Sequence, residues 1–206
     1  MVLHKIQQGA EALILLDKKQ RIIIKRRIKK SYRIPEIDDR IRKLRTRSEA
    51  KLLEKASKAI FVPKVLKFDE KGKEIALEFI DGKKLSEHLD NFSLNKQKEI
   101  CMEIGKNTAK LHNSSIIHGD LTTSNMILTE KNGQVYFIDF GLGFISHKFE
   151  DKAVDIHLLK QAIEAKHFKN WKNLFNEFLK GYKNSKDYKI VLERLKKVEK
   201  RRRYGN

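Results

Sequence analysis

Residues 116–143 constrain the possible fold more than any other part of the chain. The stretch reads IIHGDLTTSNMILTEKNGQVYFIDFGLG, with Asp120 and Asn125 before a short apolar run and Asp139 after a second one. Residues 131–133 have the composition of a turn, so the stretch predicts a short hairpin with these three side chains at one edge. Mg²⁺ prefers oxygen ligands, and phosphoryl transfer needs a carboxylate that orients the attacking hydroxyl. We therefore predict Asp120 as the base, and Asn125 and Asp139 as metal ligands.

Each half of this stretch has a simpler alternative, because Asp, Asn and Gly are common in ordinary turns. The motif H-x-D-x-x-x-x-N followed by D-F-G resembles the pattern of the protein-kinase-like superfamily. Both motifs at this spacing and in this order are not expected by chance. The resemblance implies an α+β, minimal two-lobed protein-kinase-like fold. It would have an antiparallel sheet plus helices in the N-lobe and a mainly helical C-lobe.

Composition limits the size of the fold and the kind of partner. The 206 residues can form one sizeable core or two small lobes, and typical protein kinases are longer. The formal net charge of +19 favours an acidic partner, such as RNA or an acidic protein surface. The single cysteine, Cys101, is expected to be a buried core thiol, and a reducing, cytoplasmic compartment is the default. We expect no membrane contact, because no apolar run approaches the length of a span.

The N-terminus predicts two strands, at residues 2–6 and 13–16, around a loop with one glycine. Aligned with the kinase loop G-x-G-x-x-G-x-V, Gly9 takes the middle glycine position. One glycine still lets backbone N–H groups approach a phosphate, although an ordinary hairpin turn is the alternative. The residues expected to contact the nucleotide are Gln7, Gln8, Gly9, Ala10, Glu11 and Ala12.

Lys25 ends a β-branched strand predicted over residues 21–25, as in the V-A-I-K pattern. We expect it to bind the α- and β-phosphates of ATP. The rival cations are Arg26, Arg27 and Lys29, for which a solvated basic face is the alternative.

The partner of Lys25 is expected in a helical pattern over residues 36–59, which we interpret as two consecutive helices beginning at Pro35. Glu49 is the predicted partner, because Glu54 lies off the same face. The inward stripe of this segment is predicted to be Ile37, Ile41, Leu44, Leu52, Leu53 and Ala56.

Residues 65–68 and 74–79 predict a second hairpin, which leads into a hinge between the lobes. Adenine would hydrogen-bond main-chain groups near Glu78 and Ile80, with Leu77 in the gatekeeper position. This expectation rests on the order of the elements alone. It divides the chain into an N-lobe, residues 1–82, and a C-lobe, residues 83–206.

The C-lobe is predicted to be helical, with a truncated activation segment. Ser93 is expected to cap a helix over residues 94–112, and His118 to pack and hydrogen-bond beneath the catalytic loop. Only thirteen residues separate Gly141 from Asp155, with no A-P-E motif, and Gly119 replaces the arginine of H-R-D. The peptide-substrate platform and control by activation-loop phosphorylation are therefore not expected.

Three helices are predicted to close the chain, over residues 151–165, 168–182 and 188–199. The aromatic stripe of the second helix, which begins with Phe168, is expected to be core rather than a base-stacking platform. Residues 200–206 form a basic tail that is expected to be solvated, with RNA phosphates or the nucleotide within its reach.

Several motifs together are similar to the small atypical kinase family of the KEOPS (EKC) complex. They are HGDLTTSNMIL, IDFGLG, EDKAVDIHLL, the loop QGAEA, the segment KRRIKKSYRIPEIDDRIR and the basic tail, and they span nearly the whole chain. The resemblance implies Mg-ATP binding, Ser/Thr autophosphorylation and an ATPase role in threonylcarbamoyladenosine modification of tRNA. It also implies contact of the C-lobe with the threonylcarbamoyl-transferring subunit and of the N-lobe with a small regulatory subunit.

Two other classes of protein fit parts of the pattern. RIO kinases and small-molecule kinases also carry HGD-x-x-x-x-N, but the short chain and the complete D-F-G argue against the small-molecule kinases. A non-catalytic scaffold or RNA-binding module with a kinase shell is the other class. The joint presence of Lys25, Asp120, Asn125 and Asp139 argues against that alternative.

Overall fold

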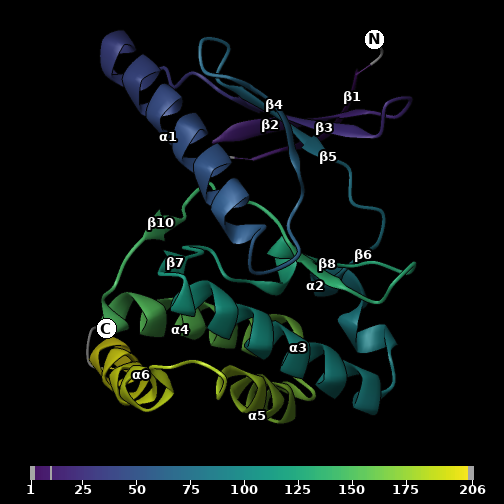
Figure 1. Cartoon of the computed structure of the whole chain (residues 1–206), viewed down its shortest axis with the longest axis vertical. Coiled ribbons are helices and arrows are strands. Elements are labelled where there is room, and N and C mark those ends of the chain that lie inside the picture. Colours follow the sequence, from purple (N-terminus) through teal and green to yellow (C-terminus); the bar gives the residue numbers. More distant parts are fainter. Residues whose placement is uncertain (1–2, 10, 204–206) are drawn as a thin grey trace.

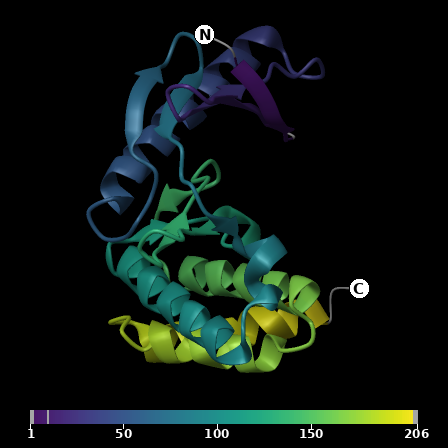
Figure 2. The same ribbon diagram turned by 90° about the vertical axis from the view of Figure 1, so that its right-hand side faces the viewer.

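A five-stranded antiparallel sheet and one long helix form the N-terminal part of the computed structural model (Figures 1 and 2), which describes residues 3–9 and 11–203. The strand order is β1-β2-β3-β5-β4, with α1 packed beside β4 and β5. The elements are β1 (Leu3–Gln8), β2 (Ala12–Asp17), β3 (Ile22–Arg27), α1 (Pro35–Ala56), β4 (Val65–Asp69) and β5 (Glu74–Glu78).

Helix α1 differs from its prediction in two ways. It is one helix rather than two, because residues 36–59 contain no glycine or proline that would break it. The inward stripe is also wrong in its first half, since Ile37 and Leu44 are exposed. The face buried there carries the polar residues Asp38 and Thr46 instead. Periodicity identifies residues that share a face, but it does not show which face another element covers.

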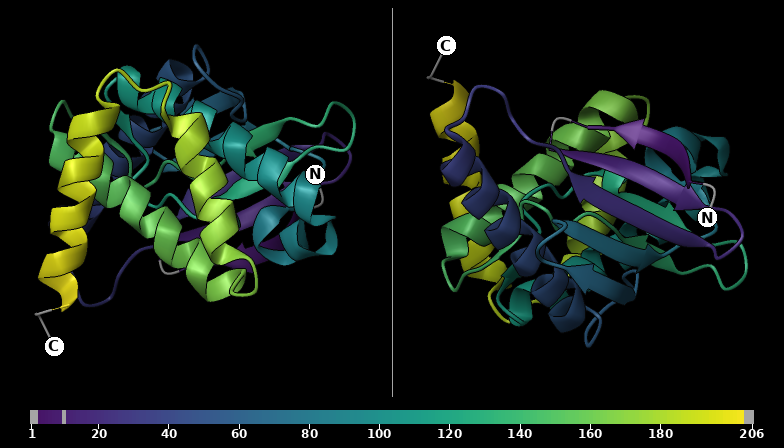
Figure 3. Two further views of the ribbon diagram at one scale, coloured as in Figure 1. Left: turned by 90° about the horizontal axis from the view of Figure 1, so that it is seen from below. Right: turned by 90° about the horizontal axis from the view of Figure 1, so that it is seen from above.

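The remaining chain is mainly helical and lies below the sheet in Figure 1. Figure 3 shows α6 lying across α4 on the underside. The helices are α2 (Leu85–His88), α3 (Leu94–Asn113), α4 (Phe149–Lys166), α5 (Trp171–Tyr182) and α6 (Tyr188–Arg203), with 3₁₀ turns η1 (Leu89–Asn91) and η2 (Thr123–Asn125). The short strands are β6 (Lys83–Lys84), β7 (Ile116–Ile117), β8 (Met126–Leu128), β9 (Val135–Phe137) and β10 (Phe144–Ile145).

The core of this helical part rests on a close crossing of α3 and α5. A Cβ added at Gly105 would lie 2.1 Å from the Phe178 carbonyl oxygen, and one at Gly181 would lie 2.0 Å from that of Met102. Only glycine permits helix backbones to approach so closely. Ser93 caps α3 as predicted, because its side chain accepts from the Lys96 N–H.

Two predictions in the C-terminal helices are wrong. Phe168 precedes α5 and is 67% exposed, because a turn after α4 places it outside the core. The basic tail does not begin at residue 200, since α6 continues to Arg203. Lysine and arginine are good helix formers, and no glycine interrupts them before Gly205. Residues 204–206 lie outside the described part of the chain.

Within residues 3–9 and 11–203, no helix combines the length and the apolar character that crossing a membrane requires.

Candidate active site

The hairpin of β8 and β9 brings the predicted site residues together as the sequence suggested. Met126 pairs with Phe137, and the Ile138 N–H donates to the Asn125 carbonyl at 2.9 Å. Asn125 and Asp139 therefore lie next to each other where the two strands end. Both strands belong to the apolar core, and the polar residues Asn125 and Asp139 lie just beyond their ends, at the edge of that core.

Asp120 and Asn125 are joined directly by the asparagine amide. The Asn125 Nδ2 donates to the Asp120 carbonyl at 2.9 Å and to the carboxylate Oδ2 at 2.8 Å. Both acceptors are oxygens, which fixes the orientation of the amide. The Oδ1 of Asn125 is therefore the atom available to a metal ion, and the Asp120 carboxylate is held in place.

Asp155 in α4 organises the backbone of this loop, a role that sequence reasoning missed. Its carboxylate accepts from the His118 N–H at 2.8 Å and from the Gly119 N–H at 2.9 Å. Gly119 has φ +78, and a Cβ there would lie 2.2 Å from the Leu142 carbonyl oxygen. This position therefore requires glycine, which accounts for the missing arginine. An aspartate on the apolar face of a helix was the available signal for Asp155.

His118 packs and hydrogen-bonds beneath the loop, as expected. Its ring lies 4.6 Å from that of Phe140, and its Nε2 donates to the Ile138 carbonyl at 3.1 Å. Burial lowers the pKa of His118 below its ordinary 6.5, although the carboxylates of Asp155, Asp139 and Asp120 act in the opposite direction. The neutral ring with its proton on Nε2 satisfies this geometry.

Lys25 connects the sheet, α1 and the loop after β9. Its Nζ lies 2.6 Å from Oε1 of Glu49 and 2.5 Å from Oδ1 of Asp139. The side chains of Lys25 and Glu49 are buried, whereas that of Asp139 is 46% exposed. Burial alone would lower the pKa of Lys25, but the two carboxylates outweigh it and raise the pKa above its ordinary value.

Asp139 is ionised in this arrangement. Burial acts to raise the pKa of its carboxyl, but the charge and hydrogen bond of Lys25 and the Gly141 N–H lower it below its ordinary value. Asp139 also has φ 61, which turns the chain sharply after β9.

A second cation, Arg27, contacts the other oxygen of Glu49 at 2.6 Å.

The predicted nucleotide loop is described except for Ala10, which lies outside the described residues. Gln7 and Gln8 belong to β1 and are exposed, and the Gly9 N–H donates to the Ala12 carbonyl at 3.0 Å. Glu11 forms ion pairs with Arg45 at 2.7 Å and Arg33 at 3.5 Å. The loop is thereby fixed to α1, and its contact with phosphates stays a prediction.

The main-chain N–H groups of the hinge segment differ in their partners. The Glu78 N–H donates to Lys64 and the Phe79 N–H to Arg21, whereas no carbonyl in the described chain accepts from the Ile80 N–H. Leu77, the predicted gatekeeper, is buried.

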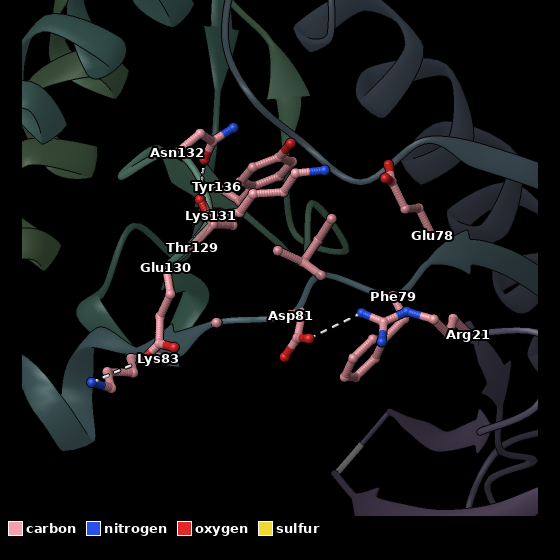
Figure 4. A pocket seen from close by; sticks show the side chains of 12 residues that line it. Arg21, Glu78, Phe79, Asp81, Lys83, Thr129, Glu130, Lys131, Asn132 and Tyr136 are labelled. Carbon is pink, nitrogen blue, oxygen red and sulfur yellow. Dashed lines mark hydrogen bonds and ion pairs between the residues drawn. The ribbon is translucent and has the colours of Figure 1, made fainter.

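A pocket of about 730 Å³ lies between the hinge and the β8–β9 turn (Figure 4). The residues that line it include Glu78 and Ile80, which are predicted to contact adenine, and none of the predicted catalytic or metal-binding side chains. The Arg21–Asp81 ion pair spans part of its rim. This pocket is therefore separate from the carboxylate cluster.

The oxygen atoms at the site fit a hard divalent cation that keeps water and phosphate ligands. Asp139 offers a partly exposed carboxylate and Asn125 an amide oxygen, which are ligand types that Mg²⁺ accepts. Across the described chain, no three His, Cys, Asp or Glu side chains form a cluster that could hold a metal by themselves.

Comparison with known proteins gives a consistent result. The family model "Protein kinase domain" matches residues 8–156. The KEOPS complex subunit Bud32 of Pyrococcus abyssi is 44% identical over 97% of this chain and 95% of its own length. A probable serine/threonine-protein kinase BUD32 homolog of Archaeoglobus fulgidus is 36% identical over 97% of this chain and 96% of its own length.

Other relatives are longer than this chain. A probable bifunctional tRNA threonylcarbamoyladenosine biosynthesis protein of Methanococcus maripaludis is 39% identical over 98% of the chain. The chain spans only 36% of that relative's length.

Proposed function

The chain belongs to the protein kinase family and, within it, to the family of the KEOPS subunit Bud32, and we propose that it binds Mg-ATP and transfers or hydrolyses its terminal phosphoryl group. The observation that carries the proposal is the contact of Lys25 with both Glu49 and Asp139. Kinase activity requires this lysine–glutamate pair and the metal-binding aspartate to be in place together.

The proposed mechanism assigns each site residue one task. Lys25 binds the α- and β-phosphates, while Asp139 and Asn125 hold Mg²⁺. Mg²⁺ held by these residues would supply positive charge against the charge that develops on the phosphates. Asp120 orients the nucleophile and accepts its proton, and the amide of Asn125 holds the Asp120 carboxylate at 2.8 Å.

Main-chain groups complete the proposed nucleotide site. The Ile80 N–H and the Glu78 carbonyl are assigned to adenine, and residues 7–12 are assigned to the phosphates. The Ile80 N–H supports this assignment, because no carbonyl of the described residues accepts from it and a bound adenine would give it a partner.

ATP hydrolysis is proposed as the principal reaction in the complex, beside Ser/Thr autophosphorylation. Ser146, the only hydroxyl residue between Gly141 and Asp155, is 9% exposed and donates to Asp151. Transfer to Ser146 therefore requires rearrangement, whereas water reaches the partly exposed Asp139 directly. The short segment also lacks the platform that positions a peptide.

We further propose that the protein works in a cytoplasmic KEOPS complex on threonylcarbamoyladenosine formation in tRNA. The names of the relatives support this role, and the +19 charge suits tRNA. Exposed apolar residues occur in both lobes, which supports contact of the C-lobe with the threonylcarbamoyl-transferring subunit and of the N-lobe with a small regulatory subunit. They include Leu142, Phe144 and Val154 in the C-lobe, and Ile37 and Leu44 on α1.

The function is tested by assembling the chain with the transferring subunit and tRNA. ATP hydrolysis and modified nucleoside are then measured for the wild type and for Asp120→Ala. We expect the wild-type complex to consume ATP and modify tRNA, and the variant to lose both activities. If the Asp120→Ala complex modifies tRNA at the wild-type rate, the chain acts as a scaffold and the proposed chemistry is wrong.

Helix α6 is proposed to contribute to the contact with tRNA. It ends with the cations Arg201, Arg202 and Arg203, and binding of phosphates by such cations releases counterions. Removal of residues 201–206 should flatten the salt dependence of tRNA binding and leave the fold intact, because Val198 is the last buried apolar residue of α6. Identical salt slopes for full-length and shortened protein would contradict this role. If the tail instead docks on a protein partner or on the nucleotide cleft, truncation would change those affinities and not the salt slope.

A further inference from the structure

Arg27 is a buried arginine that the proposed mechanism does not yet use. Its side chain is 4% exposed, and its Nη2 lies 2.6 Å from Oε2 of Glu49. Lys25 occupies the other carboxylate oxygen, Oε1, at the same distance. Glu49 is itself 1% exposed, so one deeply buried carboxylate is shared by two buried cations.

The alternation of strand β3 explains how both cations reach Glu49. Residues 25 and 27 point to the same face of the strand, because side chains repeat every two residues. Arg26 lies between them on the opposite face, is 47% exposed and pairs with Glu74. Two neighbouring arginines therefore have different environments, one in the interior and one at the surface.

Arg27 also touches α1 and the loop after β9. Its Nη2 lies 3.4 Å from the Arg45 carbonyl, one turn before Glu49. A Cβ added at Gly141 would lie 3.5 Å from the same Nη2 and 3.2 Å from the Nζ of Lys25. The guanidinium therefore contacts or borders the sheet, the helix and the metal-binding loop at one point.

The charges around Glu49 suggest why it is paired with two cations. The cluster contains two cations, Lys25 and Arg27, and two carboxylates, Glu49 and Asp139. When Lys25 contacts the phosphates of a nucleotide and stays paired with Glu49, its single charge is shared between them. A buried carboxylate that is only partly neutralised is disfavoured, so a site with Lys25 as its single cation would hold Glu49 less firmly.

We propose that Arg27 is a positioning residue of the nucleotide site: it keeps Glu49 paired and α1 in place while Lys25 engages the phosphates. This inference rests on the proposed function of Lys25. It also explains how Lys25, Glu49 and Asp139 can be held together without phosphorylation of the activation segment. Gly119 provides no arginine to receive one, and Ser146 is already bonded to Asp151. Arg27 supplies a fixed charge in the interior instead.

The test compares Arg27→Met, Arg27→Lys and the surface control Arg26→Met. Each variant has its Kd for Mg-ATP measured by calorimetry, and its KM and kcat for ATP measured in the assembled complex. We expect Arg27→Met to raise Kd and KM about tenfold and to change kcat less than about threefold, because it loosens a contact of Lys25 that already holds the nucleotide in the ground state. Arg27→Lys should recover most of the affinity, and Arg26→Met should match the wild type.

The outcomes separate the inference from the function on which it rests. Failure of the wild type and of Arg26→Met to bind Mg-ATP would overturn the proposed function itself. If the wild type binds but Arg27→Met binds equally well, the inference about Arg27 is wrong. If Arg27→Met fails to fold, Arg27→Gln takes its place, because glutamine removes the charge and keeps a polar side chain: a raised KM supports the positioning charge and a wild-type KM contradicts it.

Discussion

The interiors of the two lobes differ in the kinds of side chains that they bury. Beneath the N-terminal sheet, the buried residues include Lys25, Arg27 and Glu49, joined by ion pairs. Between α3 and α5, they are mainly apolar or aromatic, as with Ile104 and Phe178, both 0% exposed, and the buried His112 hydrogen-bonds to Tyr182. Apolar packing persists whatever is bound, whereas buried ion pairs add little net stability but can exchange partners. The proposed nucleotide site thus lies beside ion pairs that can exchange partners, and the apolar core between α3 and α5, here called the platform, supports it.

The catalytic loop lies between these two regions and depends on both. Asp155 of α4 holds the backbone at His118 and Gly119, while Asp139 receives Lys25 from the sheet. A change in the platform should therefore alter stability first, and a change in the ion-pair cluster should alter catalysis first.

The largest effect is expected from Asp139→Ala, which removes the only carboxylate assigned to the metal. Turnover of Mg-ATP should fall at least about a thousandfold, because the charge on the phosphates loses its neutralising cation. Steady-state ATP hydrolysis measures the effect, with thermal unfolding as a check on the fold. Unchanged hydrolysis would refute the metal assignment.

In the platform, Phe178→Ala should lower the free energy of unfolding by about 4 kcal/mol, through lost apolar burial and the cavity left behind. Phe178 also stacks on Phe175 and Tyr182. The matched control is Phe168→Ala, since Phe168 is 67% exposed and should cost less than about 0.5 kcal/mol. Denaturant titration compares the two, and equal losses would contradict the account of the core.

A double-mutant cycle of Lys25→Ala and Glu49→Ala sharpens the comparison on the N-lobe side. Glu49→Ala should reproduce part of the Lys25→Ala defect in ATP hydrolysis, because the carboxylate fixes the lysine against the phosphates. The double variant should be less impaired than the two losses added together, with an interaction energy of about 2 kcal/mol. Full additivity would mean that the pair does not act as one unit.

The smallest predicted effect is a dependence of stability on pH through His118. Since its folded pKa lies below the ordinary 6.5, the unfolded chain binds a proton at higher pH than the folded protein does. The contribution to stability is complete above about pH 6.5 and declines as the pH falls below it. His118→Phe should lessen this decline, at a cost of about 1 kcal/mol for the lost bond to Ile138. Urea unfolding at several pH values measures both, and an unchanged decline would contradict the assignment.

The parts of the molecule that could be predicted are those encoded by short-range chemistry. Turn residues, strand alternation and the order of motifs predicted the hairpin that joins Asn125 to Asp139, and Cys101 is buried as expected, with its pKa raised to about 12 by burial. The pairing of Lys25 with Glu49 followed from motif position, although it joins residues 24 positions apart.

The parts that escaped prediction depend on which surfaces meet. Ile37 and Phe168 are exposed because no element of the described chain covers them, which periodicity does not reveal. Arg27 was considered as a rival of Lys25 or as part of a solvated basic face. Its burial was not predicted, because it depends on the separate placement of Glu49 and Arg45 on α1. The role of Asp155 needed the fold, since it contacts residues 36 and 37 positions earlier.

The central claim is that this site separates nucleotide binding from catalysis, with Asp120 acting on the nucleophile alone. Titration of the wild type and Asp120→Ala with ATP, with and without Mg²⁺, tests it most directly when hydrolysis is followed in the same samples. We predict that Asp120→Ala keeps its affinity for Mg-ATP within about threefold while hydrolysis falls at least about a hundredfold. Loss of affinity together with activity, or hydrolysis at the wild-type rate, would contradict the account.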